Sequence, residues 1–253
     1  MPMNKVPSVL QTQNLCFHWP ERTLFSDLSV SVPPGVSLIR GEEHTGKTTL
    51  LRLLAGDVPP RSGTLAIQGN RLHEDPERYR QQVFRTDPRS ESIDQISAAT
   101  WFQSLPGRYP NFDPEALVDL IQGFALDPHI EKPMYMLSAG SKRKVLLTAA
   151  FASGTPLTLI DQPFAALDTP SMRFLSALLQ EAAEHPGRAW VLADYEAPVD
   201  VVLAISNSGE TGEVLAIVPL IKRMHAPLIS ITNNSHSTLS QAATEAQDRF
   251  DIG

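Results

Sequence analysis

Residues 41–56, GEEHTGKTTLLRLLAG, decide the fold of this chain. They follow the apolar run VSLIR (36–40) and combine a glycine-bounded turn, the tripeptide Gly-Lys-Thr and an apolar-periodic segment that closes at Gly56. A strand before and a helix after are the context in which the pattern G-x-x-x-x-G-K-[ST] binds phosphate. Free N–H groups at the helix N-terminus attract the anion, and glycine lets the backbone wrap around it. The stretch therefore predicts a nucleotide-phosphate site between a strand and a helix.

Two residues of this stretch have individual roles. Lys47 is expected to reach the β- and γ-phosphates of a nucleotide, and the Thr48 hydroxyl is expected to bind Mg²⁺. The acids Glu42 and Glu43 lie close to an anion, so they would weaken binding unless both side chains face solvent. The residues expected to contact the cofactor here are Gly41, Glu42, Glu43, His44, Thr45, Gly46, Lys47, Thr48 and Thr49.

A second motif is LIDQPFAALD (159–168), an apolar strand that ends in Asp161 and is followed by a second acid, Asp168. This layout suits a site for a Mg²⁺-bound nucleotide at the carboxyl end of a parallel strand. Gln162 stands where a nucleotide hydrolase needs a carboxylate to take a proton from water. An amide orients water but cannot accept its proton, and loss of a general base costs on the order of 10²–10⁴ in rate. The motif predicts a site that holds a nucleotide better than it hydrolyses it.

The rest of the chain alternates between strands and helices, which predicts a parallel sheet with helices on both faces. The stretch from about 89 to 150 is helical in pattern and is expected to form a helical subdomain. The expected strands are 8–19, 23–32, 36–40, 62–69, 156–161 and 188–195, and the expected helices are 97–105, 114–124, 141–152 and 170–184.

Composition limits the function classes. The chain has 253 residues, a formal net charge of −7 and a pI near 5.5, which argues against a nucleic-acid binder with a basic face. A single cysteine, Cys16, excludes an internal disulfide. Neither a signal peptide nor a membrane span is predicted. We expect a cytoplasmic protein that reaches the inner face of the membrane only through a partner and does not insert directly.

Several motifs together resemble those of ABC transporter ATP-binding domains over about residues 8–200. LSAGSKRKV (137–145) is similar to the ABC signature, and it precedes LTLIDQPFAALD by the separation that this family uses. NLCFHWP (14–20) places Trp19 where ABC domains have the aromatic residue that stacks on adenine. The resemblance implies the P-loop NTPase fold of an ABC ATPase, an α/β fold with a mixed-sheet core and a helical subdomain, within a domain of residues 1–199.

The resemblance also implies ligands and partners. Two ABC domains sandwich two ATP molecules, so Ser138 and Gly140 would contact the ATP held by a second ABC domain in a homo- or heterodimer. Asp161 would hold Mg²⁺ through water, and Asp168 would belong to the loop that links the two sites. The implied function is an ATP-binding subunit, a transporter motor that works with a separate transmembrane subunit. Trp19 as a simple core residue and Ser138 as a helix N-cap stay open as alternatives.

Departures from the family pattern cluster on the hydrolytic side. Catalysis is expected to involve Lys47 and Gln162, and turnover of this ABC-type ATPase is expected to be impaired. Alignment with the family places Ala193, followed by Asp194, at the position of the switch histidine. The other departures are Thr86 or Arg85 for the Q-loop glutamine, with Gln82 displaced upstream, and Ala139 and Ser141 in the signature.

From residue 200 the sequence resembles part of a sugar isomerase (SIS) domain, most closely that of arabinose-5-phosphate isomerases, up to about residue 243. A strand at 201–205, a hydroxyl-rich loop at 206–211, a helix and the strand PLISIT (227–232) predict a βαβ fragment within a second unit, 200–253. We expect no isomerisation, since the acid and base residues of that family have no counterpart, and we expect a frayed tail at 244–253. His225 and His236 show no metal-ligand spacing.

Three alternatives stay open for this C-terminal segment. It could instead form the strand pair that ends an ABC domain. It could make the chain a phosphosugar-binding or isomerase-related protein. It could also mark a non-productive fusion.

Overall fold

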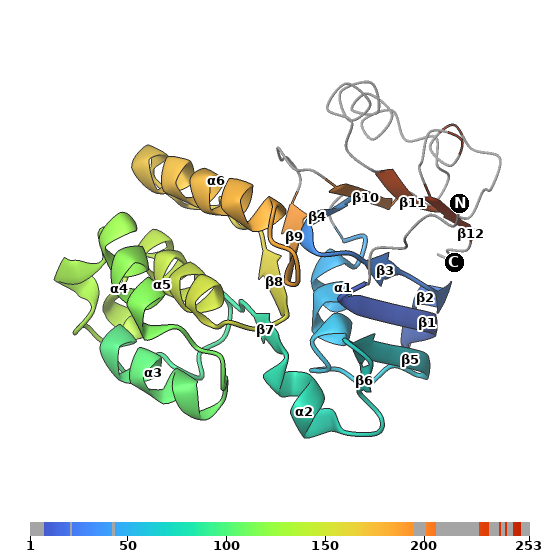
Figure 1. Cartoon of the computed structure of the whole chain (residues 1–253), viewed down its shortest axis with the longest axis horizontal. Helices are drawn as coiled ribbons and strands as arrows, with labels where there is room; N and C mark the ends of the chain where they lie inside the picture. Colours follow the sequence, from blue (N-terminus) through green and yellow to red (C-terminus); the bar gives the residue numbers. More distant parts are fainter. Residues whose placement is uncertain are drawn as a thin grey trace.

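The computed structural model describes residues 8–20, 22–41, 44–194, 201–205, 228–232, 238, 241 and 245–248. Within them, two sheets stand beside a group of helices (Figure 1). The larger sheet has the strand order β12-β11-β10-β4-β9-β8-β7, and every neighbouring pair in it is parallel. Its strands are β4 (Gly35–Arg40), β7 (Val83–Arg85), β8 (Leu157–Asp161), β9 (Ala189–Asp194), β10 (Val201–Ile205), β11 (Leu228–Thr232) and β12 (Glu245–Asp248).

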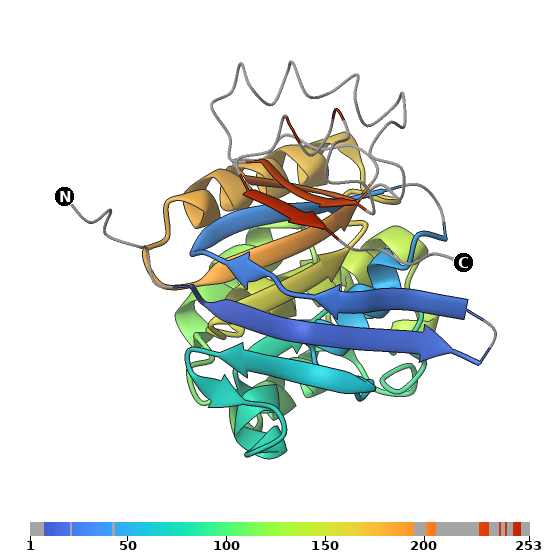
Figure 2. The same cartoon turned by 90° about the vertical axis from the view of Figure 1, so that its right-hand side faces the viewer.

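The smaller sheet is antiparallel and has the order β2-β1-β5-β6, with β3 paired to β1. Figure 2 shows the long strand β1 crossing in front of the parallel sheet. The strands are β1 (Leu10–Trp19), β2 (Arg22–Leu28), β3 (Ser31–Val32), β5 (Ser62–Ile67) and β6 (Asn70–Arg71). The α-helices of the described residues are α1 (Lys47–Leu54), α2 (Pro76–Gln81), α3 (Ala98–Ser104), α4 (Pro114–Gly123), α5 (Ala139–Ala152) and α6 (Thr169–Ala183).

The parallel sheet separates two apolar cores, because both faces of its central strands are buried. On β4, Val36 and Leu38 pack into the core formed with α3 to α6, whereas Ile39 packs into the core formed with α1 and the antiparallel sheet. On β9, Trp190 and Leu192 face the first core in the same way. The alternation explains why these strands read as continuous apolar runs in the sequence.

Short polar side chains fix the starts of most helices. Asp75, Ser97, Asp113, Ser138 and Asp168 each occupy an N-cap, and each accepts a hydrogen bond from a backbone N–H of the first turn. Such caps satisfy N–H groups that have no partner inside the helix. The predicted helices at 97–105, 114–124, 141–152 and 170–184 are confirmed to within a few residues, and so are the predicted strands. The region 70–85, which forms β6, α2 and β7, was not predicted.

The C-terminal segment extends the parallel sheet. β10 lies against β4, with Leu203 opposite Ile39, and β11 and β12 follow in parallel order. The alternative of a strand pair within 201–217 stays a prediction, because its second strand lies outside the described residues. The loop at 206–211, the predicted helix after it, and His225 and His236 lie outside the described residues. The expected frayed tail is wrong for 245–248, because this segment pairs with the otherwise open edge of β11.

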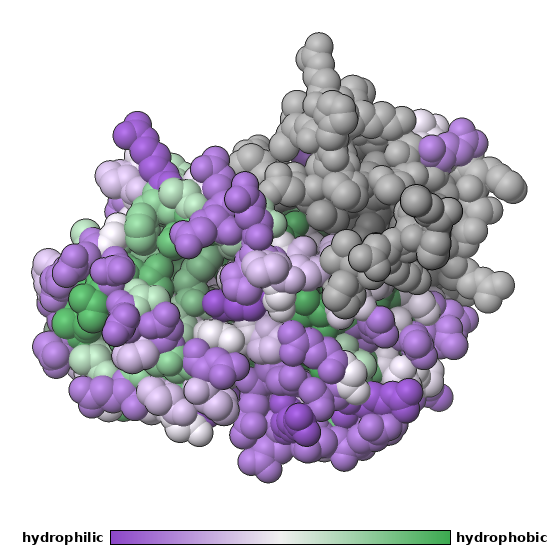
Figure 3. All heavy atoms as spheres, in the orientation of Figure 1, coloured by the Kyte–Doolittle hydropathy of each residue, from purple (hydrophilic) through white to green (hydrophobic). Residues whose placement is uncertain are grey.

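Polarity differs over the visible surface. Figure 3 shows hydrophobic side chains over the helical region and hydrophilic ones around α2. In the described part of the chain, no helix combines the length and the apolar character that a membrane crossing needs.

Candidate nucleotide-binding site

The phosphate loop lies between the end of β4 and the start of α1. Gly41 is buried, and α1 begins at Lys47. Gly46, the N-cap of α1, has a φ of 93°, and a Cβ added there would lie 3.3 Å from the Phe25 ring. His44 also has a left-handed φ, 63°. The turn therefore needs glycine at position 46, while Glu42 and Glu43 lie outside the described residues.

Lys47 folds back over this loop. Its side chain is buried, and Nζ donates a hydrogen bond to the carbonyl oxygen of Gly41 at 2.6 Å. A buried ammonium is costly unless it is paired with acceptors. The lysine is therefore held at the mouth of the loop, where anionic oxygens would be favoured ligands.

A hydroxyl and a carboxylate meet at the adjacent strand end. Thr48 Oγ1, in the first turn of α1, donates to Asp161 Oδ2 at the end of β8, and the two oxygens are 2.6 Å apart. Mg²⁺ takes one or two protein oxygens and completes its shell with water and phosphate. The described residues contain no cluster of three or more histidine, cysteine or acidic side chains. This oxygen pair thus fits a Mg²⁺ ion that arrives with a nucleotide.

Gln162 follows Asp161 in a strained backbone conformation. Its φ is 48°, and its N–H donates to the Ala193 carbonyl at 2.7 Å. Its own carbonyl oxygen accepts a hydrogen bond from Arg143, which also donates to the Asp161 carbonyl at 3.0 Å. Burial lowers the pKa of Arg143, and the nearby carboxylates of Asp161 and Asp194 oppose that shift. The turn that presents the Gln162 side chain is therefore fixed on both sides.

Lys47, Thr48, Asp161 and Gln162 border one cavity of about 510 Å³. Trp19, at the end of β1, is 43% exposed and meets Phe17 edge-on at 5.1 Å. The alternative that Trp19 is a simple core residue is wrong, because the residue is exposed and lines the cavity. The lining residues are Trp19, Arg22, Leu24, His44, Gly46, Lys47, Thr48, Thr49, Arg52, Arg89, Asp161 and Gln162.

Three arginines in that lining were missed from the sequence. Arg22 comes from β2, Arg52 from α1 and Arg89 from the segment after β7. Arg22 donates to the His44 carbonyl at 3.4 Å, so it supports the phosphate loop from the side of Trp19. Only the proximity of Arg52 to Gly-Lys-Thr was a usable sequence signal.

Ser138 and Gly140 lie elsewhere in this single chain. Neither belongs to the cavity lining. Ser138 is the N-cap of α5 and accepts a hydrogen bond from the Ser141 N–H at 3.1 Å, which confirms the N-cap alternative. A Cβ on Gly140 would lie 2.4 Å from the Ala166 carbonyl oxygen, so close packing requires glycine there. Both residues are at the exposed start of a helix, where a second molecule can reach them.

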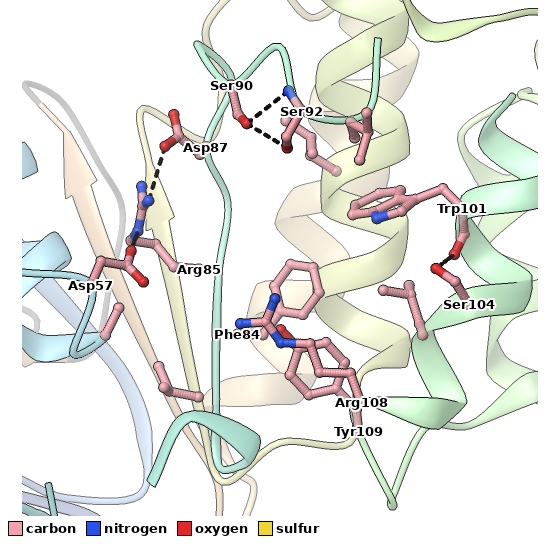
Figure 4. Close-up of a pocket in the computed structure, with 15 residues that line it drawn as sticks. Asp57, Phe84, Arg85, Asp87, Ser90, Ser92, Trp101, Ser104, Arg108 and Tyr109 are labelled. Carbon is pink, nitrogen blue, oxygen red and sulfur yellow. Dashed lines mark hydrogen bonds and ion pairs between the residues drawn. The ribbon is translucent and has the colours of Figure 1, made fainter. Parts of the chain in front are cut away.

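Arg85 lines a different cavity, of about 320 Å³, and its side chain extends toward Asp57 and Asp87 (Figure 4). It pairs with Asp57 at 2.6 Å and with Asp87 at 2.9 Å. Burial tends to lower the pKa of Arg85, but the bonds to Asp87 and Asp57 raise it overall. Thr86 instead is buried, and its hydroxyl accepts from the Asp161 N–H at 3.4 Å. Of the two residues considered for the Q-loop position, Thr86 is the one whose side chain contacts the backbone of Asp161.

Two further departures have structural explanations. Gln82 ends α2 at the opposite end of β7, and its buried Oε1 has no hydrogen-bond partner among the described residues. Ala193 is fully buried in the core shared with α1. The side chain at position 193, which alignment matched to the switch histidine, packs in that core and does not line the nucleotide cavity. Asp194, the next residue, is the last described residue of β9 and is only partly buried.

A parallel sheet with a glycine turn, a buried lysine and a threonine–aspartate pair at its carboxyl edge defines a P-loop nucleotide-binding protein. The family model described as ABC transporter matches residues 25–165, more than half of the chain. The chain belongs to the ABC transporter family, as an ATP-binding subunit. A second family model, described as SIS domain, matches residues 191–248.

Known relatives agree with this assignment. A cytochrome c biogenesis ATP-binding export protein, CcmA, of Haemophilus influenzae is 30% identical over 193 residues, which cover 75% of this chain and 90% of that protein. The protein of the same name from Nitrosococcus oceani is 32% identical over 184 residues, covering 71% and 83%. A solved ATP-binding subunit of an ABC transporter has a TM-score of 0.69 at 22% identity and covers 78% of this chain and 85% of its own.

Proposed function

We propose that this chain binds ATP with Mg²⁺ in the 510 Å³ cavity and hydrolyses it slowly. The buried Lys47 ammonium supports the proposal most directly, because it lies beside the phosphate loop and donates a hydrogen bond to the carbonyl of Gly41. In this proposal Trp19 stacks on the base, residues 41–49 surround the phosphates and Thr48 and Asp161 bind the metal. Bound Mg²⁺ would supply positive charge to the terminal phosphates.

Slow hydrolysis follows from Gln162. Hydrogen bonds from Arg143 and to the Ala193 carbonyl fix the backbone of Gln162, whose side chain lines the cavity. This position therefore offers an amide to the cavity in place of a carboxylate. The amide is able to orient a water molecule, but the proton has no acceptor on this residue. Binding and release of ATP would then be separable from turnover.

The proposed partners are a second ABC domain and a separate membrane subunit. Ser138 and Gly140 are exposed or partly exposed at the N-terminus of α5, where N–H groups and the helix dipole favour an anion. They are proposed to contact the ATP of the second domain. The curated relatives are named as cytochrome c biogenesis ATP-binding export proteins, and we propose a related export role at the inner face of the membrane.

A titration with a fluorescent ATP analogue tests ATP binding. Replacement of Lys47 by alanine should weaken binding by about 30-fold, since a hydrogen bond to a charged group contributes about 1.5–3 kcal/mol. Lys132→Ala is the matched control, because Lys132 is exposed and, among the described residues, its amine bonds only the His129 ring, at 3.1 Å. Equal affinity of the wild type and the Lys47 variant would reject the phosphate-loop assignment.

The SIS-like segment is proposed to complete the ABC sheet rather than to bind a sugar phosphate. Strand β10 pairs with the second edge of β4, and β11 and β12 extend the sheet beyond it. The competing function is phosphosugar binding. Calorimetry with arabinose 5-phosphate and glucosamine 6-phosphate separates the two, and a saturable signal at micromolar ligand that Ser206→Ala or Ser208→Ala abolishes would establish the second function instead.

A further inference from the structure

Arg89 is a cation of the nucleotide cavity with no partner of its own in the described part of the chain. It lines the same cavity as Lys47, Asp161 and Gln162 and is exposed. The hydrogen bond recorded for it uses its backbone N–H, and its guanidinium makes no hydrogen bond or ion pair with any residue that the structure describes. A guanidinium that lines a cavity without a protein acceptor is available to an anionic ligand.

The backbone around Arg89 is nevertheless fixed. Asp87 Oδ1 accepts from the Arg89 N–H at 3.2 Å, and Asp87 is itself held by Arg85 at 2.9 Å (Figure 4). On the other side, the Ser90 carbonyl accepts from Lys142 Nζ at 3.1 Å. Only the side chain of Arg89 is therefore left to move, which keeps the ordering cost of binding small.

The order of the strands in the sheet indicates whether Arg89 lies near the base or near the phosphates of a bound nucleotide. The segment that contains it follows β7, and β7 pairs with β8, whose last residue is the proposed metal ligand Asp161. Trp19 comes from the antiparallel sheet and marks the base end. Arg89 is thus on the side of the proposed metal site, away from the strand that bears the base-stacking ring.

The charge around the cavity favours a highly anionic ligand. Among the described lining residues, Arg22, Lys47, Arg52 and Arg89 are cationic and Asp161 is the one carboxylate. Arg22 is already engaged with the His44 carbonyl, and Arg52 lies in the last turn of α1, where a cation favours the helix dipole. Neither a hydrogen bond of its guanidinium to a described residue nor a helix dipole accounts for the position of Arg89 in the cavity. Arginine also matches phosphate geometry, because its planar fork donates two parallel hydrogen bonds.

We propose that Arg89 binds the terminal phosphate of a nucleoside triphosphate and so makes the site prefer ATP to ADP. This proposal rests on the proposed nucleotide site and adds a residue that selects for the third phosphate. Arg89 binds and orients the phosphate chain and takes no part in proton transfer.

Affinities of ATP and ADP, both with Mg²⁺, test the proposal on the full-length chain. Arg89→Ala should weaken ATP binding about tenfold, which corresponds to about 1.4 kcal/mol, and should change ADP binding by less than about twofold. Arg89→Lys keeps the charge but loses the planar fork, so its ATP affinity should lie between those of the wild type and of Arg89→Ala. Arg78→Ala, an exposed arginine on α2 outside the cavity, is the control for net charge and should change neither affinity.

Two results would overturn the proposal. One is an equal loss of ATP and ADP affinity in Arg89→Ala, or no loss of either. The other is a lysine variant as weak for ATP as the alanine variant. Unfolding midpoints of all variants, measured in parallel, show whether a loss comes from misfolding, which would affect both nucleotides. A wild-type chain that binds neither nucleotide would reject the nucleotide site itself, whereas binding by the wild type with an unchanged Arg89→Ala would reject this inference alone.

Discussion

Replacing Gln162 by glutamate should raise the rate of ATP hydrolysis about 100-fold. The two side chains have almost the same shape, and the φ of 48° at this position strains either residue equally, so the turn should persist. A general base contributes on the order of 10²–10⁴ in rate. The low end of that range is expected because Arg143, which bonds the carbonyl of residue 162, places a cation near the new carboxylate. A nearby cation lowers the pKa of a carboxyl group and so makes the carboxylate a weaker base. A 100-fold gain corresponds to about 2.7 kcal/mol of activation free energy.

Steady-state phosphate release at saturating Mg²⁺–ATP measures this gain. Gln68→Glu is a matched control, because Gln68 is exposed, lies outside the cavity and has nearly the same φ, 47°. A rise of less than about threefold in Gln162→Glu, with ATP affinity intact, would show that the side chain does not reach the attacking water. A rise of about 10⁴ would show that the base is not weakened and that Gln162 was the sole deficiency.

Three further predictions concern other parts of the fold. Trp19→Ala should weaken ATP and ADP alike by about tenfold in a fluorescence titration, since base stacking contributes about 1–3 kcal/mol. Gly140→Ala should lower the unfolding temperature by several degrees in calorimetry, because its Cβ would lie 2.4 Å from the Ala166 carbonyl oxygen and overpacking costs about 1–3 kcal/mol. Asp168→Asn should lower the urea midpoint at pH 7, and the difference from the wild type should shrink steadily as the pH falls below the ordinary carboxyl pKa. The bond to Lys144 and those from Ser171 depress the pKa of Asp168, so its stabilisation is present above the ordinary carboxyl pKa and is lost as pH falls through the depressed one.

Most of the proposed nucleotide site could be predicted from local sequence. Lys47 and Thr48 belong to one short pattern, and Asp161 and Gln162 to another, and parallel strand ends meet at one sheet edge, so the two patterns could be placed together. The signature serine was likewise readable, because an N-cap depends on residues only three apart. These predictions needed no knowledge of side-chain packing.

Features that depend on packing were missed. Arg89 is an isolated arginine in a loop, and only the pairing of β7 with β8 brings it to the cavity. Ala193 was placed by alignment, which does not reveal that its side chain points into the core. The short elements α2 and β7 are rich in arginine and glutamine, so the periodicity of 76–85 indicated neither a helix nor a strand.

Because β4 lies between β9 and β10 in the sheet, it can pair with neighbouring strands only late in translation. Both neighbours are parallel to β4 and are translated long after it, one at 189–194 and the other at 201–205. At about 5–20 residues per second, the phosphate-loop strand waits roughly 10–30 s on the ribosome for its first neighbour. During that time Val36, Leu38 and Ile39 have no sheet to cover them. Distant pairing of this kind folds slowly, so a nucleotide can stabilise the nascent chain only when synthesis is nearly complete, and premature termination would release an apolar strand with two open edges.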